Sequence, residues 1–211
     1  MNIQTVLFDL DGTLIDTNEL IHASFEYTFA TYNYSFTREE IMQFNGPPLW
    51  DTFHQLNPEL ADKMMETYQV HNHKHHEQYI KVFPNVEETL IGLRELGIKL
   101  AVVTAKKRVG AELGLKIAGL DKYFDTIITV DDVEYSKPHP ESVLKAMQAL
   151  DAEAHTTIMV GDNYHDIEAG KNANTLTAGV AWTLKGKDFL ATFKPTYMLE
   201  DMKDLLRIVG E

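Results

Sequence analysis

The chain has 211 residues, which is enough for one hydrophobic core or for one domain with an insertion. It carries 19 basic and 32 acidic residues, and the net charge of −13 argues against binding to nucleic acid or to an anionic membrane surface. Without cysteine it has no disulfides or thiolate metal sites, and no apolar run approaches the roughly 18 residues of a membrane span. Composition therefore predicts a cytoplasmic protein with neither nucleic-acid nor membrane partners.

An apolar run near the N-terminus, residues 6–14, contains two carboxylates, Asp9 and Asp11, followed by Gly12. A run of this kind bounded by glycine predicts a strand buried on both faces, and open α/β sheets bind ligands at the carboxyl ends of their strands. The turn at Gly12 can bring both carboxylates to one pocket, where they repel each other unless a cation lies between them. Mg²⁺ fits because it prefers oxygen ligands and keeps water for a phosphate. The alternative is an ordinary Asp-Gly turn after a buried strand.

Residues 16–80 show the spacing of helices, without a legible buried strand. Residues 37–40, Thr-Arg-Glu-Glu, have the pattern of a capping box, and the Gly-Pro-Pro sequence at 46–48 predicts a rigid turn. We therefore expect a small helical cap over residues 16–80, inserted into a core that comprises residues 1–15 and 81–211.

Four histidines stand close together at positions 71, 73, 75 and 76. His71 and His75 share a helix face, which is compatible with a metal site. However, the sequence offers only Glu77 as a further ligand nearby, so we favour a solvated helix face.

From residue 84 onward, apolar strands alternate with helical segments. Strands are predicted at residues 98–104, 126–130, 157–161, 175–181 and 197–199, and helices at residues 86–96, 106–118, 143–150, 163–173 and 202–209. This alternation predicts parallel strands with right-handed crossovers. The expected fold is α/β, a Rossmann-like parallel sheet core with an inserted α-helical cap.

The first four predicted strands are each followed by groups suited to phosphate or metal chemistry. In chain order these groups are Asp9 and Asp11, Thr104, Lys137, and Asp162 and Asp166. Taken singly, Thr104 and Asp162 have the alternative role of helix N-caps, and Lys137 that of a surface cation. Taken together, acids, a hydroxyl and an ammonium that follow four strands predict one catalytic crevice at a single edge of the sheet.

The same groups resemble the four ordered motifs of the haloacid dehalogenase superfamily of phosphohydrolases: residues 9–13, Thr104, Lys137 and residues 161–166. The helical insertion is similar to the cap of that superfamily, so the resemblance covers essentially the whole chain. Residues 46–49, 160–166 and 178–182 further resemble the PpaX-type bacterial inorganic pyrophosphatases. This closer resemblance implies pyrophosphate as the substrate and a functional link to the HPr kinase/phosphorylase, whose dephosphorylation reaction releases pyrophosphate.

The resemblance implies a role for each motif residue. Asp9 is the expected nucleophile, which forms an aspartyl-phosphate, and Asp11 is the general acid and then the base. Thr104 is expected to hold the transferring phosphoryl group together with nearby backbone N–H groups, while Lys137 offsets its charge. The implied Mg²⁺ ligands are Asp9, Asp11 through its carbonyl, Asp162, and Asp166 through water or hydrogen bonds.

Substrate specificity is expected to come from two further segments. Ala105 and Lys106 open the helix after the second strand and could bind a second phosphate group, although a solvated basic helix start is the alternative. Gly46 lies in the turn that resembles the substrate-contacting cap loop, although a plain helix–helix turn is also compatible. A phosphatase or mutase acting on a small phosphate ester, such as phosphoglycolate or a sugar phosphate, is the alternative function. A binding or regulatory protein without turnover is the third, and the complete set of acids argues against it.

Overall fold

The computed structural model describes residues 3–45 and 47–210, so the expected substrate contact at Gly46 lies outside the described residues. The chain forms two compact units, one comprising Met1–Asp16 and Lys81–Glu211 and the other comprising Thr17–Ile80. Asp16 belongs to the first unit because its short strand β2 (Ile15–Asp16) pairs antiparallel with β3 (Lys81–Val82).

The first unit is built on a six-stranded sheet in which every neighbouring pair is parallel. In spatial order its strands are β5 (Thr126–Ile128), β4 (Lys99–Val103), β1 (Thr5–Phe8), β6 (Thr157–Gly161), β7 (Leu176–Val180) and β8 (Tyr197–Leu199). Strand β1 lies near the middle, with Leu7 opposite Ala101 on one side and Met159 on the other. The predicted parallel α/β fold is confirmed.

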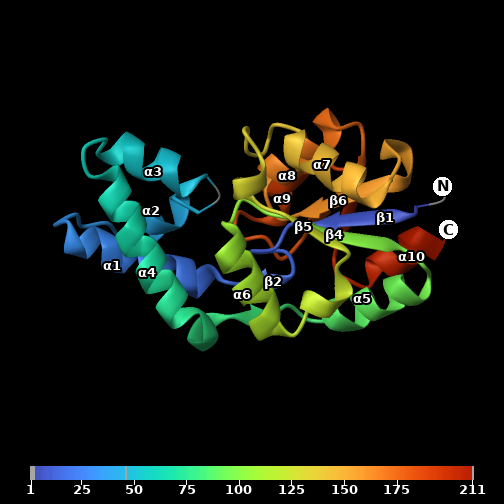
Figure 1. Cartoon of the computed structure of the whole chain (residues 1–211), viewed down its shortest axis with the longest axis horizontal. Helices are drawn as coiled ribbons and strands as arrows, with labels where there is room; N and C mark the ends of the chain where they lie inside the picture. The colour runs from blue at the N-terminus through green and yellow to red at the C-terminus, as the bar shows by residue number, and fades with distance from the viewer. Residues whose placement is uncertain (1–2, 46, 211) are drawn as a thin grey trace. The chain divides into compact units, whose positions relative to one another are not determined.

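Helices cover both faces of this sheet. Figure 1 shows α7 (Glu141–Leu150) and α8 (Tyr164–Asn172) on one face, and α5 (Val86–Glu95), α6 (Arg108–Ala118) and α10 (Asp204–Gly210) on the other. The short helix α9 (Lys187–Ala191) was not predicted from the sequence. Buried aliphatic side chains fill the space between sheet and helices, because strands covered on both faces require apolar residues throughout.

Several predicted boundaries differ from the structure by one or more residues, and two of these lie next to the site. Helix α6 begins at Arg108 rather than at residue 106, because the Lys106 N–H donates to Thr104 Oγ1 (3.1 Å) and the chain turns before the helix starts. Strand β5 ends at Ile128, and the chain continues as a 3₁₀ turn over Val130–Asp132.

The described residues of the second unit form four helices, α1 (Asn18–Thr31), α2 (Arg38–Gln43), α3 (Leu49–Leu56) and α4 (Ala61–Tyr79). Its core is aromatic: the rings of Phe25 and Phe29 stack with centroids 5.5 Å apart, and Phe53 and Tyr68 pack against Phe25. The predicted capping box is confirmed at the start of α2.

The prediction of a solvated histidine face is wrong in part. His76 is buried, and its Nδ1 lies 2.9 Å from the carbonyl oxygen of Asn72. His71 is partly buried, with its ring stacked on Tyr27 and its Nδ1 3.2 Å from Ser24 Oγ. Helix α4 therefore turns part of its histidine-rich face into the helical unit, which periodicity alone did not reveal.

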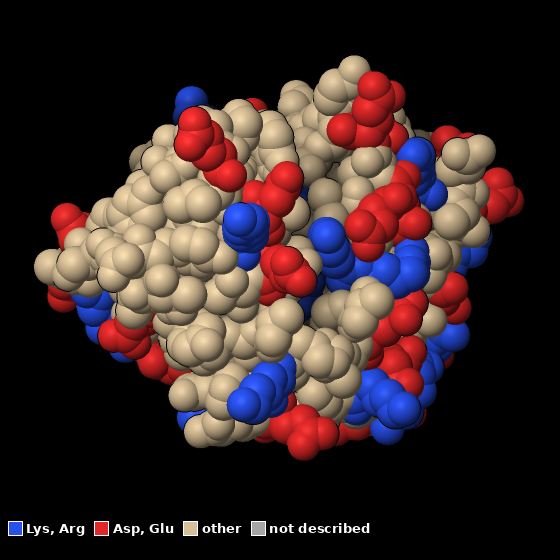
Figure 2. Space-filling view, turned by 60° about the vertical axis from the view of Figure 1, so that its left-hand side comes forward, with Lys and Arg blue, Asp and Glu red and all other residues tan. Residues whose placement is uncertain are grey.

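The surface carries both signs of charge. Figure 2 shows one face of the molecule, on which acidic and basic side chains lie interspersed. Ion pairs join some of the charged residues, such as Arg38 with Glu19 and Lys203 with Glu88. Among residues 3–45 and 47–210, no helix combines the length and apolar content needed to cross a bilayer.

Candidate active site

The end of β1 places Asp9 at the carboxyl edge of the sheet. Its backbone N–H donates to the Val160 carbonyl of β6 (2.9 Å), and its side chain is largely buried. The chain then turns sharply, because the Leu10 carbonyl accepts bonds from the backbone N–H groups of the three residues 13–15. Gly12 adopts φ +83°, and a Cβ atom there would lie 2.5 Å from Asp162 Oδ2. Glycine is therefore required at this turn by both conformation and space.

The end of β6 brings Asp166 to the same place. Gly161 closes the strand, and a Cβ atom on it would lie 2.2 Å from the Asp166 Cβ. The backbone N–H of Asn163 donates to Asp166 Oδ2 (3.0 Å), which fixes the carboxylate on the first turn of α8. Asp166 is 2% exposed, so this charge requires a partner inside the protein.

Lys137 is that partner. Its Nζ donates to Asp166 Oδ1 (2.5 Å), Asp9 Oδ1 (2.8 Å) and the Val103 carbonyl oxygen (2.9 Å). An ammonium has three N–H donors, so all three are used and the group has one position. Lys137 thereby joins the ends of β1, β4 and α8 to the loop that follows β5.

The electrostatics of this cluster favour a further cation. Burial raises the pKa of the Asp9 carboxyl to about 7, in opposition to the nearby Lys137 charge. Burial also raises the pKa of Asp162 well above its ordinary value, and the charges of Asp166 and Asp9 add to this. For Lys137, burial acts to lower the pKa, but the charges of Asp166 and Asp9 raise it above the ordinary value. One ammonium therefore does not fully compensate three carboxylates.

The donor set fits a hard divalent cation. Each of Asp9, Asp162 and Asp166 offers one carboxylate oxygen, and these atoms lie within 4.8 Å of one another. All-oxygen ligation is what Mg²⁺ prefers, and a divalent charge would counter the repulsion that raises the carboxyl pKa values. Among the described residues this is the single group of three such side chains, and no histidine belongs to it.

The residues after β4 lie along the same edge. Thr104 is buried, and its Oγ1 accepts from the Lys106 N–H, which leaves the hydroxyl hydrogen to donate to a ligand. Ala105 is exposed in the turn between them. The Lys106 Nζ donates to Asp11 Oδ1 (3.0 Å), so the carboxylate expected to act as acid and base lies beside the cation expected to bind a phosphate group.

A family model described as haloacid dehalogenase-like hydrolase matches residues 6–180. The chain belongs to the haloacid dehalogenase-like hydrolase family. A protein named pyrophosphatase PpaX from Oceanobacillus iheyensis is 52% identical to it over 211 residues, which cover 100% of this chain and 99% of that protein. A protein of the same name from Anoxybacillus flavithermus is 53% identical over 211 residues, which cover 100% of this chain and 98% of that protein. A crystal structure of a "predicted phosphatase" from Clostridium acetobutylicum has a TM-score of 0.89 and 26% identity, covering 100% of this chain and 99% of that one. The predicted PpaX-type resemblance is confirmed.

Sequence reasoning missed some contacts of this haloacid dehalogenase-like hydrolase site. It placed Asp11 and Lys106 in separate roles and did not foresee their ion pair. It also missed the Val103 carbonyl as the third acceptor for Lys137, and the Asn163 N–H as a donor to Asp166. The capping pattern of Asn163 followed three residues later by Asp166 was the one available signal for the last contact.

Proposed function

We propose that this haloacid dehalogenase-like hydrolase cleaves inorganic pyrophosphate into two phosphate ions. The observation that carries the proposal is the full-length identity of 52% to a protein named pyrophosphatase PpaX. The cluster of acids, ammonium groups and a hydroxyl at one sheet edge supports it, since phosphoryl transfer needs positioning and charge neutralisation.

In the proposed first step, an Asp9 carboxylate oxygen forms a bond to phosphorus while the bridging P–O bond of pyrophosphate breaks. The departing phosphate takes a proton from Asp11, and the product on the enzyme is an aspartyl-phosphate. In the second step, water attacks this phosphorus, Asp11 accepts the proton, and the carboxylate of Asp9 is regenerated. The Asp9 carboxyl must be ionised to act as a nucleophile, and Lys137 at 2.8 Å favours that form.

A magnesium ion is the proposed cofactor. Asp9, Asp162 and the carbonyl of Asp11 would hold it, and Asp166 would contribute indirectly because its two oxygens accept from Lys137 and the Asn163 N–H. When bound, Mg²⁺ neutralises negative charge on the phosphate oxygens and on the carboxylates around it.

The remaining expected residues act on the substrate in this proposal. Thr104 donates its hydroxyl to the transferring phosphoryl group, with the backbone at Ala105 beside it, and Lys137 offsets the charge. Lys106 binds the second phosphate group of pyrophosphate, which requires its ammonium to share or exchange its bond to Asp11. For Gly46, contact of the cap loop with substrate stays a prediction, as do the cytoplasmic location and the functional link to the HPr kinase/phosphorylase.

The test is a substrate panel. Phosphate release is measured from pyrophosphate, phosphoglycolate and glucose phosphates, each with Mg²⁺ and with a chelator. We expect Mg²⁺-dependent release with the highest kcat/KM on pyrophosphate. A higher kcat/KM on any ester would overturn pyrophosphate as the substrate, and inactivity on the whole panel would overturn the hydrolase function.

A further inference from the structure

Two of the loops that carry expected site residues follow neighbouring strands, and backbone hydrogen bonds join them. The loop after β4 carries Thr104 and Lys106, and the chain after β5 leads to Lys137. The Thr104 N–H donates to the Ile128 carbonyl (2.9 Å), and the Val130 N–H donates to the Lys106 carbonyl (3.2 Å). These bonds set where the Thr104 hydroxyl and the Lys106 ammonium lie relative to the loop that follows β5.

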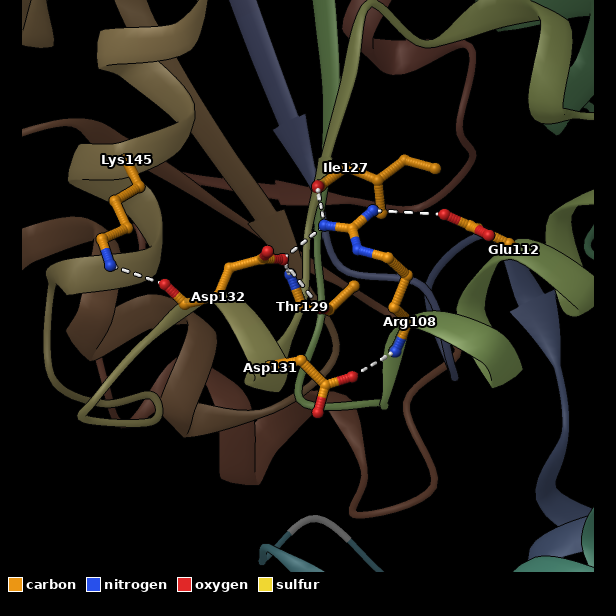
Figure 3. A network of polar contacts seen from close by, with 7 residues as sticks. All are labelled: Arg108, Glu112, Ile127, Thr129, Asp131, Asp132 and Lys145. Atoms are coloured by element: carbon orange, nitrogen blue, oxygen red, sulfur yellow. Dashed lines mark hydrogen bonds and ion pairs between the residues drawn. The ribbon is translucent and has the colours of Figure 1, made fainter.

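A side-chain network continues this connection outside the crevice (Figure 3). At the start of α6, the Arg108 backbone N–H donates to Asp131 Oδ2 (2.9 Å). Its guanidinium Nη2 donates both to the Ile127 carbonyl (3.1 Å) and to Asp132 Oδ2 (2.6 Å), and its Nη1 donates to Glu112 Oε1 (3.2 Å). Arg108 therefore bonds the end of β5 and the turn after it to the helix that follows Lys106.

The network reaches the Lys137 loop through Asp132. The Asp132 carboxylate accepts from the N–H of Thr129 (2.8 Å) and from its hydroxyl (2.7 Å), which closes the turn after β5. The Asp132 carbonyl accepts from Lys145 Nζ (2.5 Å), which also pairs with Glu141 at 2.8 Å. The Glu141 carboxylate in turn accepts from the backbone N–H groups of residues 134 and 135 (3.1 and 2.9 Å).

At the Glu141 end of the network, one carboxylate accepts bonds from a side chain and from the loop backbone. Hydrogen bonds from Lys145 and from the N–H groups of Tyr135 and Glu134 lower the pKa of Glu141 to about 2. Tyr135 is two residues from Lys137, so the bonded loop ends next to the residue whose three bonds hold the buried cluster.

We propose that Arg108 and Asp132, named here the strand-end clamp, are positioning residues that set the spacing between the Thr104–Lys106 turn and the Lys137 loop during phosphoryl transfer. The expected effect on catalysis rests on the proposed function, whereas the contacts of Arg108 and Asp132 are those of the structure itself. Both side chains are more than a quarter exposed, at 39% and 31%, so the pair contributes little to stability. A displacement of about 1 Å in catalytic geometry nevertheless costs about 100-fold in rate, so the main effect is expected in kcat.

The same two strands carry a matched control at their other ends. Arg94 Nη1 lies 2.6 Å from Asp125 Oδ2, which also accepts from the Leu100 N–H of β4 (3.0 Å). The side-chain exposures in this pair, 41% and 34%, are close to those of the clamp. Because Asp125 and Leu100 lie at the amino ends of β5 and β4, loss of the Arg94 ion pair removes an arginine contact from the same two strands without disturbing the edge that carries the expected site residues.

The experiment compares Arg108→Met with Arg94→Met, since methionine keeps much of the apolar stem and removes the guanidinium. For Arg108→Met we expect kcat on pyrophosphate to fall at least tenfold, with KM changed less than threefold and Tm lowered by a few degrees. For Arg94→Met we expect a similar fall in Tm and kcat within twofold of wild type. Arg108→Lys should recover part of the lost kcat. If Arg108→Met keeps kcat within twofold, or if both variants lose it equally, the clamp is overturned.

A double-mutant cycle tests the pairing itself. If the two residues act as one unit, Arg108→Met combined with Asp132→Asn should lose no more kcat than the worse single variant. Multiplicative losses would mean that the residues act separately, which contradicts the proposal.

Binding of orthovanadate, a mimic of the transferring phosphoryl group, separates this inference from the proposed function. With Mg²⁺ present, Arg108→Met should weaken vanadate binding at least tenfold and Arg94→Met less than twofold, whichever phosphate compound the wild type hydrolyses. Absence of pyrophosphate hydrolysis by the wild type would overturn the proposed function, whereas equal vanadate affinity in the two variants would overturn the clamp.

Discussion

The two units of the molecule use the same local hydrogen bond for different purposes. In the helical unit, the Thr37 N–H donates to the Glu40 carboxylate (2.7 Å) at an exposed helix start. In the α/β unit, the Asn163 N–H donates to the Asp166 carboxylate (3.0 Å), which is buried against Lys137. A capping pattern therefore specifies a helix start, while burial and charged neighbours decide whether its acid becomes part of a site.

The hydrophobic cores of the two units are built from different kinds of side chain. The helical unit packs aromatic rings around Phe25, whereas the cluster between the sheet and α7 and α8 consists of aliphatic side chains and methionines. Parallel strands covered on both faces have their carboxyl ends at one edge, where they can present groups from distant segments together. In the helical unit, the helices pack around an aromatic cluster and form a separate hydrophobic core instead. Each variant below alters one of the two units and tests whether the altered residue serves catalysis or stability.

The largest expected effect is that of Asp9→Asn in the α/β unit. The amide has the shape of the carboxylate but cannot form an acyl phosphate, so turnover should fall by at least about a thousandfold. Phosphate release and a thermal melt on the same sample check this, and the Tm should stay within a few degrees of wild type. Substantial residual hydrolysis would indicate direct attack by water.

Phe25→Ala tests the independence of the aromatic core. Loss of a fully buried ring should destabilise the helical unit by about 3–5 kcal/mol. The chain has two tryptophans, Trp50 in the helical unit and Trp182 in the α/β unit, so each unit has its own fluorescence probe. In single-tryptophan backgrounds made with Trp182→Phe or Trp50→Phe, the denaturation midpoint seen by Trp50 should fall more than that seen by Trp182. Equal shifts would mean that both units unfold as one.

Lys106→Ala tests whether the ammonium group beside Asp11 binds the second phosphate group of pyrophosphate. We expect KM for pyrophosphate to rise about tenfold, the equivalent of one charge-assisted hydrogen bond, and KM for phosphoglycolate to rise less than threefold. Steady-state kinetics on both substrates provide the measurement. The same increase for both would remove Lys106 from this specific role.

The smallest expected effect is that of Thr37→Ala. Losing the exposed N-cap should lower the free energy of unfolding of the helical unit by about 1 kcal/mol. The Trp50 transition measures that loss, and kcat should stay within twofold of wild type because Thr37 is not among the residues expected to act on the substrate or the metal. The control is Asp166→Asn, which removes the charge of the buried acid in the capping pattern of α8; we expect a clear loss of kcat because Lys137 loses a charged partner. Equal kcat values for the two variants would contradict the distinction between the two helix starts.

The main strands and helices of the α/β unit, the parallel sheet and the groups at the strand ends could be predicted from the sequence, whereas α9 and the short pair β2 and β3 were missed. Apolar runs, helical spacing and motif order are local properties, so β1 and β6 with their following acids could be predicted without coordinates. The tertiary structure alone decided the burial of His76, the pairing of Lys106 with Asp11, the three bonds of Lys137 and the clamp of Arg108 with Asp132. Those contacts depend on which rotamer each side chain adopts and on the low-dielectric surroundings that distant segments create, and neither is encoded in the spacing of residues along one stretch.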